Sequence, residues 1–193
     1  MFVDRVRAGR MIVVPLALAG ALVLGACSDS DADATEAATT ASTETPASAE
    51  TVTVTGIDYG YEGLPATAAV GTSLAFANAS DTELHELVAI RLPSDETRTA
   101  EELLALSAEE QAALLSSAEP AMVLIARPGE DAIPVVGTGE LAEAGRYLVL
   151  CAIPTGANAD EYLAAAATSD GPPQVEGGPP HFTAGMFGEV TVE

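Results

Sequence analysis

The chain of 193 residues is poor in the residue types that several functions require. It has 7 Lys and Arg against 29 Asp and Glu, with a formal net charge of −22. So few cations cannot neutralise a run of phosphates, which excludes nucleic-acid binding. It also has no Trp and only 4% aromatic residues. A single domain of this length must therefore build its core from aliphatic side chains.

Histidine and cysteine are equally scarce, since the sequence holds only His85, His181, Cys27 and Cys151. No serine–histidine or zinc motif emerges from them, and paired carboxylates such as Glu109 and Glu110 fit a solvated helix surface. We therefore expect no enzymatic activity. The acidity has a simple explanation in solubility outside the cell, and a sharper one in electrostatic steering toward a basic partner.

Residues 1–26 have the pattern of an export signal. Arg5, Arg7 and Arg10 precede an apolar run, Met11 to Gly25, which is too short to cross a membrane comfortably. The run ends at Leu24-Gly25-Ala26-Cys27, which resembles the lipobox of bacterial lipoproteins, where the cysteine is acylated and becomes the new N-terminus. The resemblance implies an extracytoplasmic protein anchored to a bacterial membrane by lipid on Cys27; a plain secretory signal is the alternative.

Whether Cys27 carries lipid determines whether Cys151 can form a disulfide. If Cys27 carries lipid, Cys151 stays a free thiol in an oxidising compartment, and a bound metal would explain it. If Cys27 stays free, a Cys27–Cys151 disulfide becomes possible and a metal site fails. Residues 27–50 are rich in Ser, Asp, Ala, Thr and Glu, and predict a disordered acidic tether.

From residue 51 to 193 the hydrophobic pattern predicts one mainly β domain. Short alternating or apolar segments are separated by Gly, Pro and Asn at hairpin spacing, which is typical of a sandwich. The segments are Thr51–Thr55, Val70–Phe76, Leu84–Ile90, Ala121–Ala126, Ile133–Val136, Tyr147–Cys151 and Gly188–Val192. Tyr147–Cys151 is apolar at every position, which predicts a central strand buried on both faces.

Two insertions interrupt the strands. About residues 95–119, capping boxes at Thr99-x-x-Glu102 and Ser107-x-x-Glu110 predict a helical insertion. We interpret it as a lid or a hairpin packed on the side, with no chemistry of its own. About residues 152–180, a loop insertion should hold a short helix, Asp160 to Ala167, with Asp160 as its cap, and a Gly/Pro-rich return.

Four side chains outside these insertions form a ligand set. His181 and Met186 share one loop, Cys151 ends the buried strand, and His85 stands where a loop enters a strand. Two imidazoles and a thiolate with a weak axial thioether are the ligands of an electron-transfer copper site. Taken singly, each residue is more often structural than a ligand. Together they include both histidines and the only spare cysteine, which favours copper binding.

These residues resemble the cupredoxin family, the small blue-copper proteins of the plastocyanin type. The similar pieces are the strand end at Asn78 followed by a loop and His85, Gly145 to Cys151, and Pro180-His181 with Gly185-Met186-Phe187-Gly188. The resemblance implies a cupredoxin-like Greek-key β-sandwich. It also implies one copper ion, cycling between Cu(I) and Cu(II), on His85, Cys151, His181 and Met186, with Asn78, Glu86, Phe182 and Phe187 around them.

Two features depart from that family. Its members separate the cysteine from the second histidine by a few residues, whereas 29 lie between Cys151 and His181. Lengthening the loop so much costs roughly 2 kcal/mol at about 0.6 kcal/mol per doubling, against roughly 10–16 kcal/mol for metal binding at structural zinc sites. Glu86 stands where the family usually has Asn, and its carboxylate would either hydrogen-bond a loop amide or approach the metal.

The expected function is one-electron transfer by a monomeric, membrane-anchored copper protein with a basic redox partner. Non-redox copper storage, delivery or sensing is one alternative. A metal-free protein-interaction module on the same sandwich is another. Copper oxidases of related fold need more than two histidines.

Overall fold

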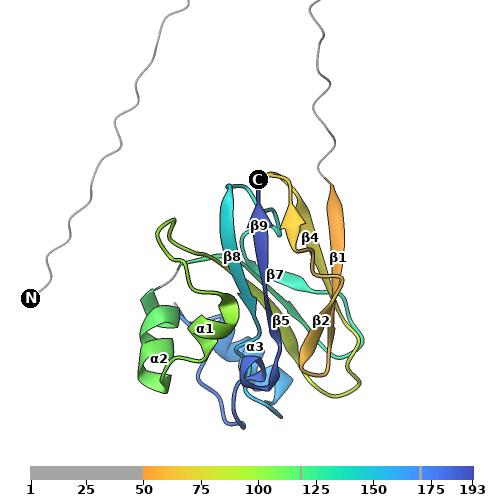
Figure 1. Cartoon of the computed structure of the whole chain (residues 1–193). Coiled ribbons are helices and arrows are strands. Elements are labelled where there is room, and N and C mark those ends of the chain that lie inside the picture. Colours follow the sequence, from red (N-terminus) through yellow and green to blue (C-terminus); the bar gives the residue numbers. More distant parts are fainter. Residues whose placement is uncertain (1–49, 118, 170) are drawn as a thin grey trace, which may run out of the picture. The chain divides into compact units, whose positions relative to one another are not determined.

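The computed structural model describes residues 50–117, 119–169 and 171–193, which form a mainly β sandwich of two sheets (Figure 1). The smaller sheet has the order β2-β1-β4, made of β2 (Gly60–Glu62), β1 (Thr51–Ile57) and β4 (Ser73–Asn78). The larger has the order β3-β9-β8-β5-β6-β7, made of β3 (Thr67–Ala68), β9 (Phe187–Val192), β8 (Gly145–Leu150), β5 (His85–Arg91), β6 (Pro120–Ala126) and β7 (Ile133–Val136). The fold class predicted from the sequence is confirmed.

The predicted signal peptide, residues 1–26, and Cys27 lie outside the described residues, as does the tether as far as residue 49. These assignments stay predictions. No helix in the described ranges is long and apolar enough to cross a membrane.

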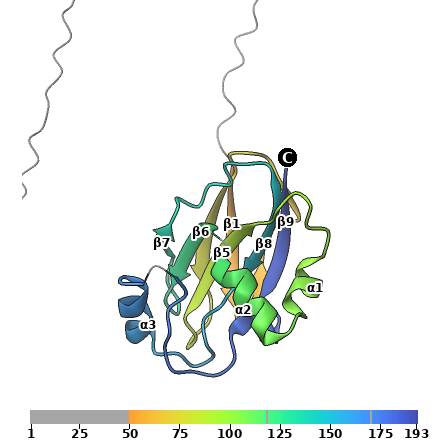
Figure 2. The same cartoon turned by 90° about the vertical axis from the view of Figure 1, so that its left-hand side faces the viewer.

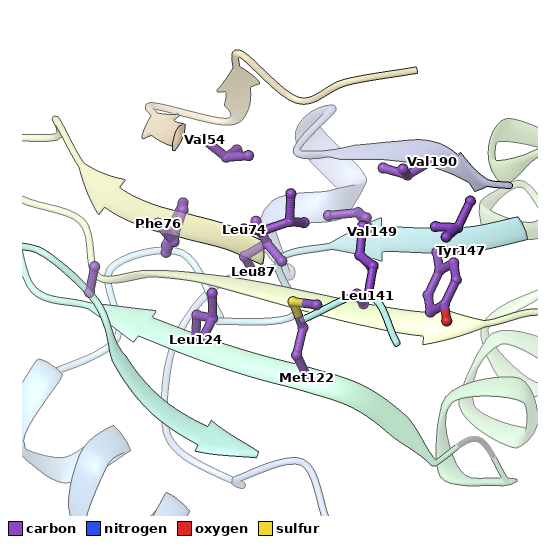
Figure 3. Close-up of a cluster of buried hydrophobic side chains, with 13 residues drawn as sticks. Val54, Leu74, Phe76, Leu87, Met122, Leu124, Leu141, Tyr147, Val149 and Val190 are labelled. Carbon is purple, nitrogen blue, oxygen red and sulfur yellow. The ribbon is translucent and has the colours of Figure 1, made fainter. Parts of the chain in front are cut away.

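The main core lies between the two sheets and is aliphatic, as the composition requires. Figure 3 shows Val54, Leu74 and Phe76 of the smaller sheet facing Leu87 and Val149 of the larger one. Pairing of period-2 strands places every second side chain in this layer, so burial of apolar area holds the sheets together.

Strand β8 is buried on both faces, as its unbroken apolar sequence predicts. Tyr147 and Val149 face the layer between the sheets, while Leu148 and Leu150 face the helices on the opposite side. β8 lies between β9 and β5, with antiparallel pairing to both. The residue that follows it, Cys151, is therefore fixed at the end of a strand that is buried on both faces and paired on both edges.

Three short helices cover the outer side of the larger sheet (Figure 2): α1 (Ala100–Leu104), α2 (Ala108–Ser117) and α3 (Ala159–Ala166). Both predicted capping boxes form, with Thr99 and Ser107 exchanging hydrogen bonds with Glu102 and Glu110. The cap predicted for α3 is wrong by two residues. Asn158 caps the helix by accepting from the backbone N–H groups of Asp160 and Glu161, because an N-cap oxygen must precede the free amides it binds.

Candidate metal centre

The topology brings three of the predicted ligands to one end of the larger sheet. His85 begins β5, and Cys151 directly follows β8. Because the two strands are antiparallel neighbours, the start of β5 lies beside the end of β8. His181 opens a short 3-10 helix, His181–Ala184, that leads into β9 on the other side of β8.

The ligand atoms of these three residues converge. The Nδ1 atoms of His85 and His181 lie 3.1 Å apart, and the Cys151 Sγ lies 3.4 Å from the His181 Nδ1. All three ligand atoms fall within 4.8 Å of one another, and all three residues are 0% exposed. Nitrogen and sulfur ligands about 2.0–2.3 Å from one tetrahedral ion lie roughly 3.3–3.7 Å from each other. The two separations lie within about 0.2 Å of this range, so the spacing fits one small metal ion.

The hydrogen-bonding capacity of this cluster also fits a bound metal ion. Two imidazole nitrogens and a sulfur share a dry space, and hydrogen bonds among them cannot satisfy every lone pair. The opposite ring atoms, Nε2 of His85 and of His181, are buried without a hydrogen-bond partner in the described chain. A cation at the convergence point would occupy both Nδ1 lone pairs and leave each Nε2 to carry the proton.

The fourth predicted ligand, Met186, lies in the same buried cluster as Cys151 and is 0% exposed. Its backbone carbonyl accepts from the Cys151 N–H at 3.1 Å, and its own N–H donates to the His181 carbonyl at 3.2 Å. Gly185, at a φ of 114°, makes the left-handed turn that ends the 3-10 helix before it. The cluster of His85, Cys151, His181 and Met186 is consistent with one type 1 copper ion.

The two ends of the long insertion between Cys151 and His181 are joined by main-chain hydrogen bonds, which form a paired neck next to the site. The Phe182 N–H donates to the Cys151 carbonyl at 2.9 Å, and the His181 N–H to the Ile153 carbonyl at 3.0 Å. Further out, the Thr155 N–H donates to the Pro179 carbonyl at 3.1 Å. The two ends of the insertion are held together, so its length does not separate the ligands.

Glu86 hydrogen-bonds a loop amide, the first of the two roles considered for it. Its Oε1 accepts from the Ala152 N–H at 3.0 Å, and its Oε2 accepts from the Tyr162 hydroxyl at 3.0 Å. It alternates with His85 along β5, so the two side chains point to opposite faces of the strand. Burial raises the pKa of Glu86 to about 7, against the opposing effect of these two donors.

Asn78 organises the loop that leads into His85. Its Nδ2 donates to the carbonyls of Glu83 at 2.8 Å and Ala126 at 3.0 Å, and its Oδ1 accepts from the Ser80 N–H at 2.9 Å. The two phenylalanines expected around the ligands, Phe182 and Phe187, pack with the apolar cluster under α1. Asn78 thus fixes the conformation of the loop before His85. The two phenylalanines belong to the apolar cluster between the larger sheet and the helices.

The environment keeps the imidazoles neutral and the thiol protonated in the metal-free protein. Burial, together with the neighbouring His181, lowers the pKa of His85 to about 4. Burial also lowers the pKa of His181, although Glu83 opposes that shift. Burial, followed by the charge of Glu86, raises the pKa of Cys151 well above its usual range. Metal binding must therefore displace a proton from Cys151, whereas the histidines need lose none.

Four further residues at the site could not be found from the sequence. Tyr59 packs edge-on against the His181 ring at 5.2 Å between centroids, and Asp58 and Glu83 place carboxylates near the two Nε2 atoms. Tyr162 reaches Glu86 from α3. They come from a turn, a loop and a helix with ordinary local patterns, so no spacing signals their role.

The chain is similar to known proteins in structure, and comparison of its sequence finds no match. No protein-family model and no curated protein matches the chain. Auracyanin A, a "blue" copper protein from the green thermophilic photosynthetic bacterium Chloroflexus aurantiacus, is 16% identical with a TM-score of 0.39, over 76% of this chain and 100% of that one.

Two further auracyanin structures show a similar degree of likeness. Reduced auracyanin from Roseiflexus castenholzii is 15% identical with a TM-score of 0.39, over 75% of this chain and 98% of that one. Auracyanin B is 19% identical with a TM-score of 0.35, over 78% and 91% of the two chains. These TM-scores are low, and the fold class rests on the strand order and burial of this chain.

Proposed function

We propose that this protein is a cupredoxin-like one-electron carrier with a single type 1 copper, held by His85, Cys151 and His181 and weakly by Met186. The observation that carries the proposal is the convergence of two Nδ1 atoms and one Sγ in a fully buried cluster. When bound, copper would supply the Cu(I)/Cu(II) couple. The chain supplies a rigid, dry cage that suits both oxidation states.

The cage is rigid because each ligand is anchored by backbone pairing. His85 begins the paired strand β5, and Cys151 directly follows the paired strand β8. Met186 is tied to Cys151 and to His181 by main-chain hydrogen bonds. A ligand set that moves little between two oxidation states needs little reorganisation when an electron passes. Complete burial also favours retention of the ion, which supports electron transfer over copper delivery.

Copper titration of the full chain, followed by optical absorption and paramagnetic resonance, tests the proposal. We expect one equivalent of copper, an intense thiolate-to-copper band and reversible one-electron chemistry. Tight binding without that band would support storage or sensing instead, and no binding would favour the metal-free interaction module.

Matched variants assign the ligands. Cys151→Ser should abolish the charge-transfer band, whereas Cys27→Ser should leave it intact. Met186→Leu should keep the copper and raise its reduction potential, because the axial thioether no longer donates electron density to Cu(II) and the more apolar site favours the lower charge of Cu(I). Met122→Leu is the control, since Met122 is equally buried but belongs to the core between the sheets.

The proposed setting is the outer side of a bacterial membrane, with lipid on Cys27 as the anchor and a basic redox protein as partner. The acidic composition, with a net charge of −22, supports such a partner through long-range steering. Cys27→Ser should release the protein from the membrane fraction. Electron exchange with a cationic redox protein should slow as salt is raised, whereas a rate insensitive to salt would contradict the proposed partner.

A further inference from the structure

The outward-facing nitrogens of the two candidate ligand histidines are the most unusual polar atoms in the described chain. Nε2 of His85 and Nε2 of His181 are buried, and neither has a hydrogen-bond partner there. A buried polar group without a partner destabilises the folded protein, so the surroundings of these atoms need an explanation.

Each of these nitrogens faces a carboxylate. The His181 Nε2 lies 3.4 Å from a carboxylate oxygen of Glu83, and the His85 Nε2 lies 3.9 Å from one of Asp58. Both distances fall within ion-pair range, but neither contact is a hydrogen bond. Movement of a few tenths of an ångström would close the Glu83 contact, and Asp58 would have to move further.

The structure holds Glu83 at this position. The same Glu83 oxygen accepts from the Gly156 N–H at 3.0 Å, and the Glu83 carbonyl accepts from Asn78. The Glu83 side chain is only 17% exposed. Asp58 is less constrained, since it sits on the β1–β2 turn and its side chain is 62% exposed.

The turn that carries Asp58 is itself strained. The next residue, Tyr59, has a φ of 61° and is the one non-glycine residue of the described ranges with positive φ. Bulky residues avoid this region because their Cβ approaches the backbone, so such a conformation points to a local requirement. Here it seats the Tyr59 ring against His181 while Asp58 faces His85.

We propose that Glu83 and Asp58 are positioning residues for the copper site, which accept the Nε2 protons of His181 and His85. This inference rests on the proposed function. A proton held on Nε2 leaves the Nδ1 lone pair free. Only in that tautomer can the Nδ1 atoms of both histidines bind the same cation. A carboxylate behind a ligand imidazole also makes it a stronger donor.

Glu83 has the larger effect of the two. It is nearer to its imidazole and less exposed than Asp58, so solvent screens its charge less. Loss of such a partner typically weakens metal affinity about 10-fold to 100-fold. We expect Glu83→Gln to weaken Cu(II) binding about tenfold, and Asp58→Asn to weaken it by less.

The first measurement compares copper affinity and reduction potential in Glu83→Gln and Asp58→Asn with two controls. The controls Glu62→Gln and Asp81→Asn remove the same charge from neighbouring exposed positions that contact neither imidazole. Because Cu(II) carries the larger charge, it loses more affinity than Cu(I). A tenfold difference between the two losses equals a rise of about 59 mV in potential. Equal behaviour of Glu83→Gln and Glu62→Gln would overturn the inference.

The second measurement needs no copper. Imidazole ¹H–¹⁵N correlation spectra of the metal-free full chain near neutral pH report which nitrogen of His181 carries the proton. We expect the Nε2–H tautomer in the wild type and in both controls, and a shift toward Nδ1–H in Glu83→Gln. An unchanged tautomer would contradict the inference. If the wild type bound no copper, the proposed function would fail while this measurement still decided the role of Glu83.

Discussion

The two insertions of this domain differ in how they meet the sheet. The first, with α1 and α2, packs apolar side chains such as Leu103 against Leu148 and Leu150. The second begins directly after Cys151, and the Tyr162 hydroxyl of its helix α3 donates to Glu86 beside the ligands. Burial of apolar area acts without direction, whereas a buried hydrogen bond requires one geometry. The first insertion therefore contributes stability, and the second also constrains the site.

The largest expected effect concerns the first insertion. Leu103→Ala removes a side chain that is 0% exposed, and it should lower the free energy of unfolding by about 2–5 kcal/mol. Chemical denaturation of the copper-loaded and copper-free protein measures the loss. The absorption of the copper site should not change, because Leu103 takes no part in the main-chain hydrogen bonds that hold Cys151, His181 and Met186. Leu104→Ala, at a partly exposed position, should cost less; an altered copper spectrum in Leu103→Ala would break the comparison.

Glu86 should give the next largest effect, through the pH dependence of stability. Its pKa is raised by burial to about 7 from 4.5, so the stability it confers is complete below pH 4.5 and is lost as pH rises through 7. The pKa of His85 is lowered by burial to about 4 from 6.5, which has the opposite effect. The stability that neutral His85 confers is lost as pH falls from 6.5 through 4. Glu86 contributes roughly 3 kcal/mol. The lowered pKa of His181 acts with the same sign as that of His85, so Glu86 offsets only part of the stability that the metal-free wild type loses as pH falls.

Glu86→Gln removes the contribution of Glu86 to the pH dependence of stability. Between pH 6.5 and pH 4 the metal-free variant should lose roughly 3 kcal/mol more than the wild type, because only the wild type regains stability as Glu86 takes up its proton. Urea denaturation at a series of pH values measures the difference. A variant whose stability follows the same pH curve as the wild type would show that Glu86 titrates normally.

Tyr162→Phe tests whether the second insertion acts on the site. Loss of its hydroxyl leaves Glu86 with one donor fewer and should cost about 1–3 kcal/mol. Because Glu86 also holds the Ala152 N–H, next to Cys151, the thiolate-to-copper band should shift as well. The matched control is Tyr147→Phe, whose hydroxyl donates to the Glu143 carbonyl at 2.8 Å, away from the ligands. Equal spectra in the two variants would remove the distinction between the insertions.

The smallest effects should come from the helix caps. Thr99→Ala and Asn158→Ala each remove an N-cap and should each cost about 1 kcal/mol. Thermal unfolding measures both losses. Only Asn158→Ala, at the start of α3, should also speed the release of copper to a chelator, because α3 carries Tyr162. Faster release in Thr99→Ala would mean that both insertions influence the site.

Local pattern was sufficient for most of the elements. Capping boxes at Thr99 and Ser107 located the helical insertion, and the unbroken apolar run before Cys151 located the central strand. The cap of α3 was misplaced, because Asn158 and Asp160 are both good caps and only the helix geometry selects between them. Such errors are local and leave the topology unchanged.

Residue composition alone establishes which atoms are available for chemistry. With two histidines, one spare cysteine and a methionine on one loop, the ligand chemistry followed from residue type, since nitrogen and sulfur donors select the metal. Whether those atoms meet depends on how the strands and loops pack. The paired neck of the 152–180 insertion returns His181 to Cys151, and the carboxylates of Glu83 and Asp58 come to the imidazoles from a loop and a turn. Contacts between residues far apart in the chain depend on the packing of whole strands, which no local spacing encodes.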